Sequence, residues 1–173
     1  VEEDKSLLEQ KLLNENPHLF VVKSISKSYG VPGLRLGIIA SGDKTRIAAM
    51  KKDVAIWNIN SFAEFYMQIY EKYKAAYTTA LQAFYATRTD FINKLKEISF
   101  LRVIPSQANY VLCEVKTPYT SRRLTSMLLE DNILIKDLSE KTGFEGRQYV
   151  RIAVRKEEDN QALITALKAM ELQ

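Results

Sequence analysis

Cysteine and histidine are scarce in this 173-residue sequence, and their scarcity argues against several kinds of site. There is one cysteine, Cys113, and one histidine, His18. A single cysteine cannot form a disulfide within the chain, and Cys113 stands in an apolar run, where we expect a small buried residue. With one histidine, a zinc site with several histidines is not possible within the chain, and a Ser-His-Asp triad would have to use His18. We therefore predict no metal site.

The sequence also lacks a long apolar run, a signal-peptide pattern and a dense block of charge. We therefore expect no membrane span, and a reducing cytoplasm is the expected location. The 25 basic and 21 acidic residues are dispersed and leave a net charge of +4, so no nucleic-acid partner is predicted. The 46% hydrophobic content is typical of a globular protein, with one ordinary domain or two small ones.

Glycine is rare as well, yet three of the six glycines fall in one short segment, Ser24 to Gly37. The segment contains one lysine between small hydroxyl residues, followed by an arginine. Apolar residues precede it at 19–22 and follow it at 38–39. This pattern predicts a buried strand, a tight loop and a second strand.

The residue types in this loop suit a ligand that carries both an aldehyde and a phosphate. A lysine amine forms an imine only when it is deprotonated, and a nearby fixed cation in a partly desolvated pocket lowers the pKa of the amine. Arg35 is a candidate for that cation, or for a bidentate partner of phosphate. Ser24 and Ser26 offer hydroxyls to phosphate oxygens. Pyridoxal phosphate (PLP) has both groups, whereas the alternative interpretation is an ordinary solvated loop.

The spacing Ser-x-Ser-Lys-x-x-Gly-x-x-Gly-x-Arg-x-Gly resembles the cofactor-lysine signature of the class I/II aminotransferases, PLP enzymes of fold type I. Within that group it is most similar to the histidinol-phosphate aminotransferases and the threonine-phosphate decarboxylases. The resemblance implies that Lys27 forms the Schiff base with PLP. It also implies that Ser24, Ser26 and Arg35 bind the cofactor phosphate.

Two further segments continue the resemblance. Residues 104–112 resemble the strand that enters the small C-terminal domain, and residues 149–155 resemble the strand with the substrate arginine. The resemblance implies that Arg151 binds the substrate carboxylate; the alternative is a surface charge on an edge strand. Lys136 stands where histidinol-phosphate enzymes have an arginine that contacts substrate phosphate, and it can still supply a point charge. Arg155, paired with Arg151, is more typical of threonine-phosphate decarboxylases.

Hydrophobic spacing predicts the remaining elements. Helices are expected at 2–16, with an acidic first turn, and at 44–51, 62–97, 120–131 and 157–172; strands are expected at 19–24, 36–40, 101–103, 109–115, 133–136 and 149–154. We expect Ser61 to cap the helix at 62–97, and a break in that helix between Ile69 and Tyr77, because it is long for a globular protein. Trp57 and Asn60 are expected near the lysine segment, without an assigned role.

The resemblance implies an α/β fold class with an α+β C-terminal subdomain. Its parts would be the end of a large PLP-binding domain at 1–74, a linking helix at 75–98 and a small C-terminal α+β domain at 99–173. In the family an aspartate at the pyridinium nitrogen, an asparagine and a tyrosine near the ring oxygen, a stacking aromatic and a glycine-containing phosphate loop come from earlier segments, and nothing here matches them. Because the sequence also opens at Val1 without methionine, we expect the C-terminal part of a longer enzyme.

Three hypotheses for function follow. In the first, the chain is part of a homodimeric PLP-dependent aminotransferase. Such an enzyme moves an amino group between a phosphorylated or otherwise anionic amino acid or amino alcohol and a 2-oxo acid. The second keeps PLP but decarboxylates O-phosphothreonine. The third is a non-catalytic fragment or dimerisation module, suggested by the missing cofactor residues and by the aromatic residues at 62–77.

Overall fold

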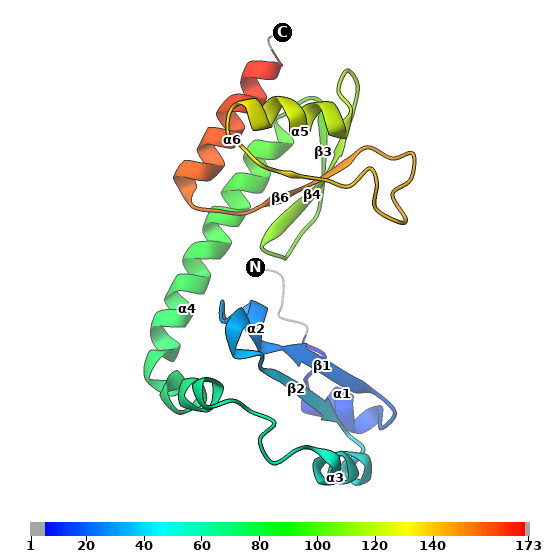
Figure 1. Ribbon diagram of the computed structural model, residues 1–173, viewed down its shortest axis with the longest axis vertical. Coiled ribbons are helices and arrows are strands. Elements are labelled where there is room, and N and C mark those ends of the chain that lie inside the picture. Colours follow the sequence, from blue (N-terminus) through cyan, green and yellow to red (C-terminus); the bar gives the residue numbers. More distant parts are fainter. Residues whose placement is uncertain (1–5, 172–173) are drawn as a thin grey trace. The chain divides into compact units, whose positions relative to one another are not determined.

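The structure is a computed structural model that describes residues 6–171 (Figure 1). The chain forms two compact units, an N-terminal unit up to Thr78 and a C-terminal unit from Thr79. Helix α4 (Ser61–Lys96) begins in the first unit and ends in the second. No helix in the described residues combines the length and the apolar character needed to cross a bilayer.

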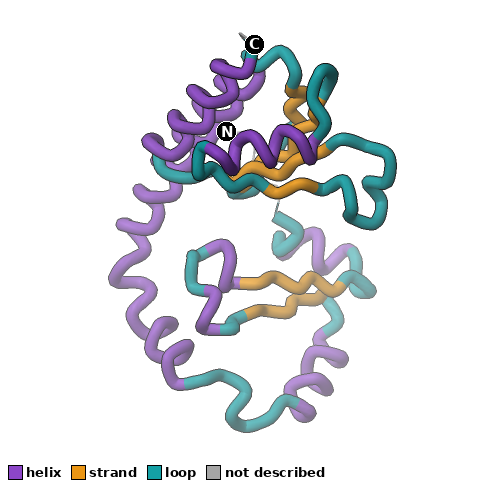
Figure 2. Tube along the Cα trace, turned by 45° about the horizontal axis from the view of Figure 1, so that its top comes forward, coloured by secondary structure: helices purple, strands orange, loops and turns teal. Residues whose placement is uncertain are grey.

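The N-terminal unit is built around one pair of antiparallel strands. Its elements are α1 (Gln10–Glu15), β1 (Phe20–Ser24), α2 (Ile25–Ser28), a 3-10 turn (Pro32–Leu34), β2 (Gly37–Ser41), α3 (Lys44–Asp53) and the first part of α4. Ser24 lies opposite Gly37 in the pairing, so residues 25–36 leave and return at the same end of the two strands (Figure 2). We call residues 25–36 the lysine loop.

The strand–loop–strand prediction is confirmed, but the predicted burial of the first strand is wrong. The Val22 side chain is 76% exposed, and Ile38 and Ile39 on β2 are also exposed. Two strands alone have too few neighbours to bury both faces of a sheet. Within the described residues, these apolar side chains of β1 and β2 therefore lie at the surface and not in a core.

The first predicted helix is shorter than expected. The described part of that segment is helical from Gln10 to Glu15, and Leu13 is its buried residue. Ser6 accepts a hydrogen bond from the Leu8 N–H (3.2 Å), a local bond of the kind that competes with helix formation. The predicted acidic first turn falls on residues 2–4, outside the described residues.

Helix α4 is continuous, so the break predicted between Ile69 and Tyr77 is wrong. Its sequence contains neither glycine nor proline. The predicted position of the break is also braced from outside the helix, because Tyr29 packs edge-on against Tyr70 (5.5 Å between ring centres) and stacks on Tyr77 (4.7 Å). Such ring pairs stabilise beyond the area they bury.

The C-terminal unit is a four-stranded antiparallel sheet with three helices. Its elements are the end of α4, β3 (Leu101–Ile104), β4 (Tyr110–Val115), α5 (Ser121–Glu130), β5 (Lys136–Asp137), β6 (Tyr149–Ala153) and α6 (Glu157–Met170), with strand order β3-β4-β6-β5. These elements confirm the predicted series. Strand β5 begins later than predicted, and Ile135, directly before it, is buried in the core.

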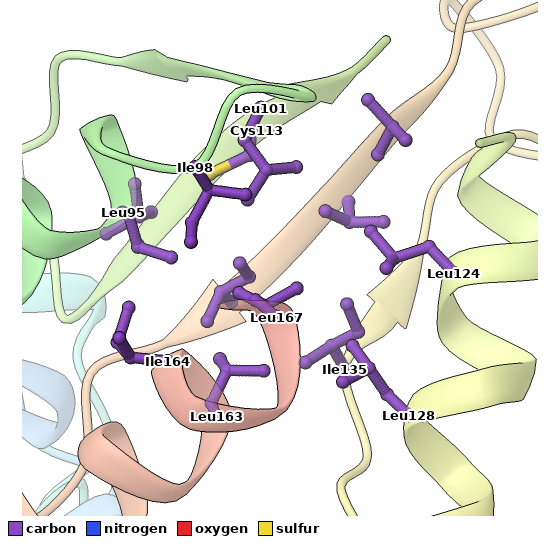
Figure 3. Close-up of a cluster of buried hydrophobic side chains, with 14 of the residues drawn as sticks. Leu95, Ile98, Leu101, Cys113, Leu124, Leu128, Ile135, Leu163, Ile164 and Leu167 are labelled. Carbon is purple, nitrogen blue, oxygen red and sulfur yellow. The ribbon is translucent and has the colours of Figure 1, made fainter. Parts of the chain in front are cut away.

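The core of this unit lies between one face of the sheet and the helices (Figure 3). Alternate residues of β4 and β6 point into it, and the helices contribute Leu95, Leu124, Leu128, Ile164 and Leu167, all essentially inaccessible. Cys113 is fully buried as predicted, and burial raises the pKa of its thiol to about 12. Each fully buried aliphatic side chain contributes roughly 1.5–3 kcal/mol of burial free energy.

Candidate functional site

The lysine loop starts with the single helical turn α2, which carries Lys27. Ser24, the last residue of β1, keeps extended backbone (φ −78°, ψ 121°) before that turn. The Ile25 N–H donates to the Leu36 carbonyl (3.0 Å), which closes the loop at its base. Gly30 adopts φ +67°, a left-handed conformation that glycine reaches without a steric penalty.

The structure places all four predicted cofactor ligands in or beside this loop. Ser24, Lys27 and Arg35 are exposed. Ser26 is only 4% exposed, and its hydroxyl donates to the Leu36 carbonyl (3.4 Å). The side chains of Ser24, Lys27 and Arg35 are therefore accessible to a ligand, and cofactor binding by all four residues stays a prediction.

These residues fit PLP by their chemistry. An amine, hydroxyls and a guanidinium match an aldehyde and a phosphate. A Cβ added at Gly30 or Gly33 would meet no atom within 4 Å, so both glycines face open space. A metal is not suggested, because residues 6–171 contain no cluster of three His, Cys, Asp or Glu side chains able to hold one.

Asn60 is the residue near the loop whose role the sequence did not indicate. Its side-chain oxygen accepts a hydrogen bond from the Ala63 N–H (2.9 Å), so Asn60, and not the predicted Ser61, caps α4. Its side-chain nitrogen donates to the Leu34 carbonyl (2.9 Å), one residue before Arg35. A polar residue directly before a long helix is a signal for a cap, but sequence carries no signal for the second bond.

Tyr29 forms a second link between the loop and α4. Its hydrogen bond with Tyr70 is the main cause that raises the pKa of Tyr70 to about 12, followed by burial and by nearby charges. Tyr66, next to Tyr70 in the same aromatic group, also has a raised pKa, through burial first and Tyr29 second. The residue two positions after Lys27 is thus bound to a regular helix.

The two predicted substrate residues meet on the sheet of the C-terminal unit. Lys136 of β5 lies directly opposite Arg151 of β6. Opposite residues share a face of the sheet, and Val150 and Ile152 on either side of Arg151 are buried, so both cations lie on the face away from the core. Strand β6 lies between β4 and β5, so the alternative that Arg151 sits on an edge strand is wrong.

The surroundings of this pair keep its positive charge available. Arg151 stands 5.4 Å from the centre of the Tyr110 ring, a cation–π contact that orients the guanidinium without neutralising it. Like charges directly opposite in a sheet are unfavourable, and a bound anion would relieve the repulsion. Arg155, by contrast, forms an ion pair with Asp159 (2.8 Å).

Comparison with known proteins identifies the family. Residues 2–167 match the family model of Aminotransferase class I and II. The chain belongs to this family. Its members are PLP-dependent enzymes, aminotransferases and decarboxylases among them. The match includes the lysine loop and the Lys136–Arg151 pair in one span of sequence.

Relatives in the class I and II aminotransferase family include both kinds of enzyme. The chain is 31% identical over 158 residues to threonine-phosphate decarboxylase of Salmonella typhimurium, covering 90% of this chain and 42% of that protein. It is 30% identical over 158 residues to the chloroplastic histidinol-phosphate aminotransferase of Nicotiana plumbaginifolia, covering 91% and 37%. The crystal structure of histidinol-phosphate aminotransferase from Clostridium acetobutylicum matches with TM-score 0.80 and 29% identity, over 95% of this chain and 49% of that one. The chain thus spans less than half the length of these relatives.

Proposed function

We propose that this chain is part of a homodimeric PLP-dependent aminotransferase that acts on a phosphorylated or otherwise anionic amino acid or amino alcohol, with a 2-oxo acid as partner. The observation that carries the proposal is the lysine loop, a segment closed at its base that contains both Lys27 and Arg35 as exposed residues. The family match supports it, because members of the family use PLP.

Each residue of the lysine loop has a distinct proposed role. When bound, PLP supplies an aldehyde for an amine and a ring that accepts electron density. Lys27 holds the cofactor through Nζ and, once displaced by the substrate amine, carries a proton to or from the substrate α-carbon. Arg35 binds the cofactor phosphate with its fork of donors, and the Ser24 hydroxyl adds a hydrogen bond. The Ser26 hydroxyl adds a second one when it turns from the Leu36 carbonyl to the phosphate.

The Lys136–Arg151 pair is the proposed determinant of substrate charge. Arg151 presents a planar fork that matches a carboxylate, whereas Lys136 offers a compact point charge that suits a phosphate oxygen. Two cations on adjacent strands favour a substrate with more than one negative charge over a neutral amine.

O-Phosphothreonine decarboxylation is the second candidate. The 31% identical relative from Salmonella typhimurium is a threonine-phosphate decarboxylase, and Lys136 departs from the arginine expected of the histidinol-phosphate enzymes. Product analysis of the complete enzyme separates the two activities. Carbon dioxide released from O-phosphothreonine supports decarboxylation, whereas an amino acid formed from a 2-oxo acid supports transamination.

The cofactor part is tested by titrating the 173-residue chain with PLP and recording its visible absorbance. The control is Lys23→Ala, which changes a lysine of the preceding strand β1. Wild type and this control are expected to develop the same visible absorbance band, and Lys27→Ala is expected to develop none. A band that survives in Lys27→Ala contradicts the assignment. If wild type gives no band and stays monomeric by size exclusion with PLP present, the third hypothesis, a non-catalytic module, is supported.

A further inference from the structure

We propose that Asn60 is a positioning residue, which holds Arg35 in the backbone conformation from which it binds the cofactor phosphate. The claim that Arg35 binds the cofactor phosphate rests on the proposed function. The contact of Asn60 with the lysine loop rests on the structure alone.

Arg35 has an unusual backbone. Its φ of 54° and ψ of 35° lie in the left-handed region, which residues with a Cβ seldom occupy. Such a conformation persists where the surrounding bonds over-determine it, and it is concentrated at functional sites. The bonds on either side of Arg35 therefore decide where its side chain starts.

The carbonyls of both residues next to Arg35, Leu34 and Leu36, are hydrogen-bonded. On the C-terminal side the Leu36 carbonyl accepts from the Ile25 N–H (3.0 Å) and from the Ser26 hydroxyl (3.4 Å), both at the start of the loop. On the N-terminal side the Leu34 carbonyl accepts from Asn60 Nδ2 (2.9 Å). Asn60 lies outside the loop, so it ties Arg35 to the beginning of α4.

One amide group makes both of the Asn60 contacts. Its oxygen caps α4 through the Ala63 N–H, and this bond fixes which way the nitrogen points. Serine and aspartate cap helices about as well as asparagine, but neither carries the amide N–H that reaches Leu34. Asn60→Ser and Asn60→Asp thus keep the cap and remove the bond to the loop.

The packing of the loop against α4 supports the same role. An open apolar groove lies between the loop and the first turns of α4, with Val31, Leu34, Phe62 and Phe65 in its lining, so apolar packing does not fix the loop there. At the other end of the loop Tyr29 packs on Tyr70 and Tyr77. These contacts seat the loop, and the directional bond from Asn60 sets the peptide next to Arg35.

The contact is tested by amide hydrogen exchange on the 173-residue chain without ligand. In Asn60→Ser we expect amides at 33–37 to exchange roughly 2- to 10-fold faster, as loss of one net hydrogen bond predicts, with the first turn of α4 unchanged. Asn58→Ser, at an exposed asparagine of the same segment, is the matched control and is expected to match wild type. Unchanged exchange at 33–37 in Asn60→Ser overturns the inference.

The role in phosphate binding is tested by comparing PLP with pyridoxal, which lacks the phosphate. Asn60→Ser is expected to weaken PLP binding by roughly tenfold, as loss of one charge-assisted contact predicts, and to leave pyridoxal binding unchanged. A general loss of structure would weaken both ligands equally, and that result overturns the positioning role. If wild type binds the two ligands equally, the proposed phosphate site fails, and with it the role of Arg35, whatever hydrogen exchange shows.

Discussion

The two units of the chain use their apolar residues in opposite ways. In the C-terminal unit the large aliphatic and aromatic side chains fill one continuous core. In the described part of the N-terminal unit the buried side chains are those of Leu13, Ser26 and Ala63, while Val22 and Phe62 are largely exposed. Burial therefore stabilises the C-terminal unit, whereas the lysine loop depends on hydrogen bonds and ring contacts with α4.

Two asparagines make the same contrast on a small scale. Asn160 is 6% exposed, and its side chain accepts from the Arg155 N–H and donates to the Arg155 carbonyl, both at 2.9 Å. Asn60 makes an equivalent pair of bonds but is exposed. The first closes the turn between β6 and α6 with a buried side chain, and the second holds a loop at a surface.

The largest expected difference between the units is in the effect of removing a phenylalanine. Phe91 is 1% exposed and Phe62 is 79% exposed, and both belong to α4. Phe91→Ala should lower the free energy of unfolding by about 3–5 kcal/mol, and Phe62→Ala should change it by about 0.5 kcal/mol or less. Urea denaturation measures both, and equal losses would show that the N-terminal unit has a core of its own.

The two asparagines should differ next. Asn160→Ala removes two part-buried hydrogen bonds to the Arg155 backbone and should cost about 1–3 kcal/mol. Asn60→Ser keeps its cap and loses one exposed bond, so about 0.5–1 kcal/mol is expected. The same denaturation series provides the values. A larger loss for Asn60→Ser would reverse the comparison.

The Lys136–Arg151 pair should lower the stability of the C-terminal unit, because both cations are kept for binding an anionic substrate. Because the like charges face each other across β5 and β6, Lys136→Gln is expected to raise the stability of the C-terminal unit by about 0.2–1 kcal/mol at low salt. The gain should disappear near 1 M salt, where the Debye length is about 3 Å. A gain that is independent of salt would mean that repulsion is not its cause.

The smallest expected effect is a pH dependence at Asp137. Burial raises the pKa of its carboxyl, but hydrogen bonds from the Ser139 N–H (3.0 Å), Ser121 and the Ser139 hydroxyl outweigh burial and hold the pKa below its usual value. A lowered native pKa means that the stabilisation is complete above the unfolded value near 3.8 and is lost as pH falls through the native value. Asp137→Asn should make the free energy of unfolding depend less on pH in the acid range, as measured by denaturation at several pH values. An unchanged pH dependence would mean that other carboxyls cause it.

Much of the C-terminal unit could be predicted because its strands alternate buried and exposed residues. Val111, Cys113 and Val115 lie on one face of β4, and this period of two is visible in the sequence. The continuity of the long helix α4 was harder to predict. Its expected break at 69–77 rested on length alone, whereas the packing of Tyr29 against that stretch comes from a distant segment and leaves no local signal.

The candidate site was predictable as residue types and not as contacts. The spacing around Lys27 identified the loop, and the family match is consistent with it. The cross-strand position of Lys136 opposite Arg151 depends on register, which is set by the pairing of β5 with β6. The bond from Asn60 to Leu34 joins segments 26 residues apart, and no periodicity encodes such a contact.

The most direct test of the central claim is to add PLP to the 173-residue chain, reduce the mixture with borohydride and locate the bound group by peptide mass spectrometry. The account predicts a phosphopyridoxyl group on Lys27 and little on Lys23 or Lys44, with the label lost in Lys27→Arg. Label spread evenly over the exposed lysines, or concentrated on another lysine, would contradict it.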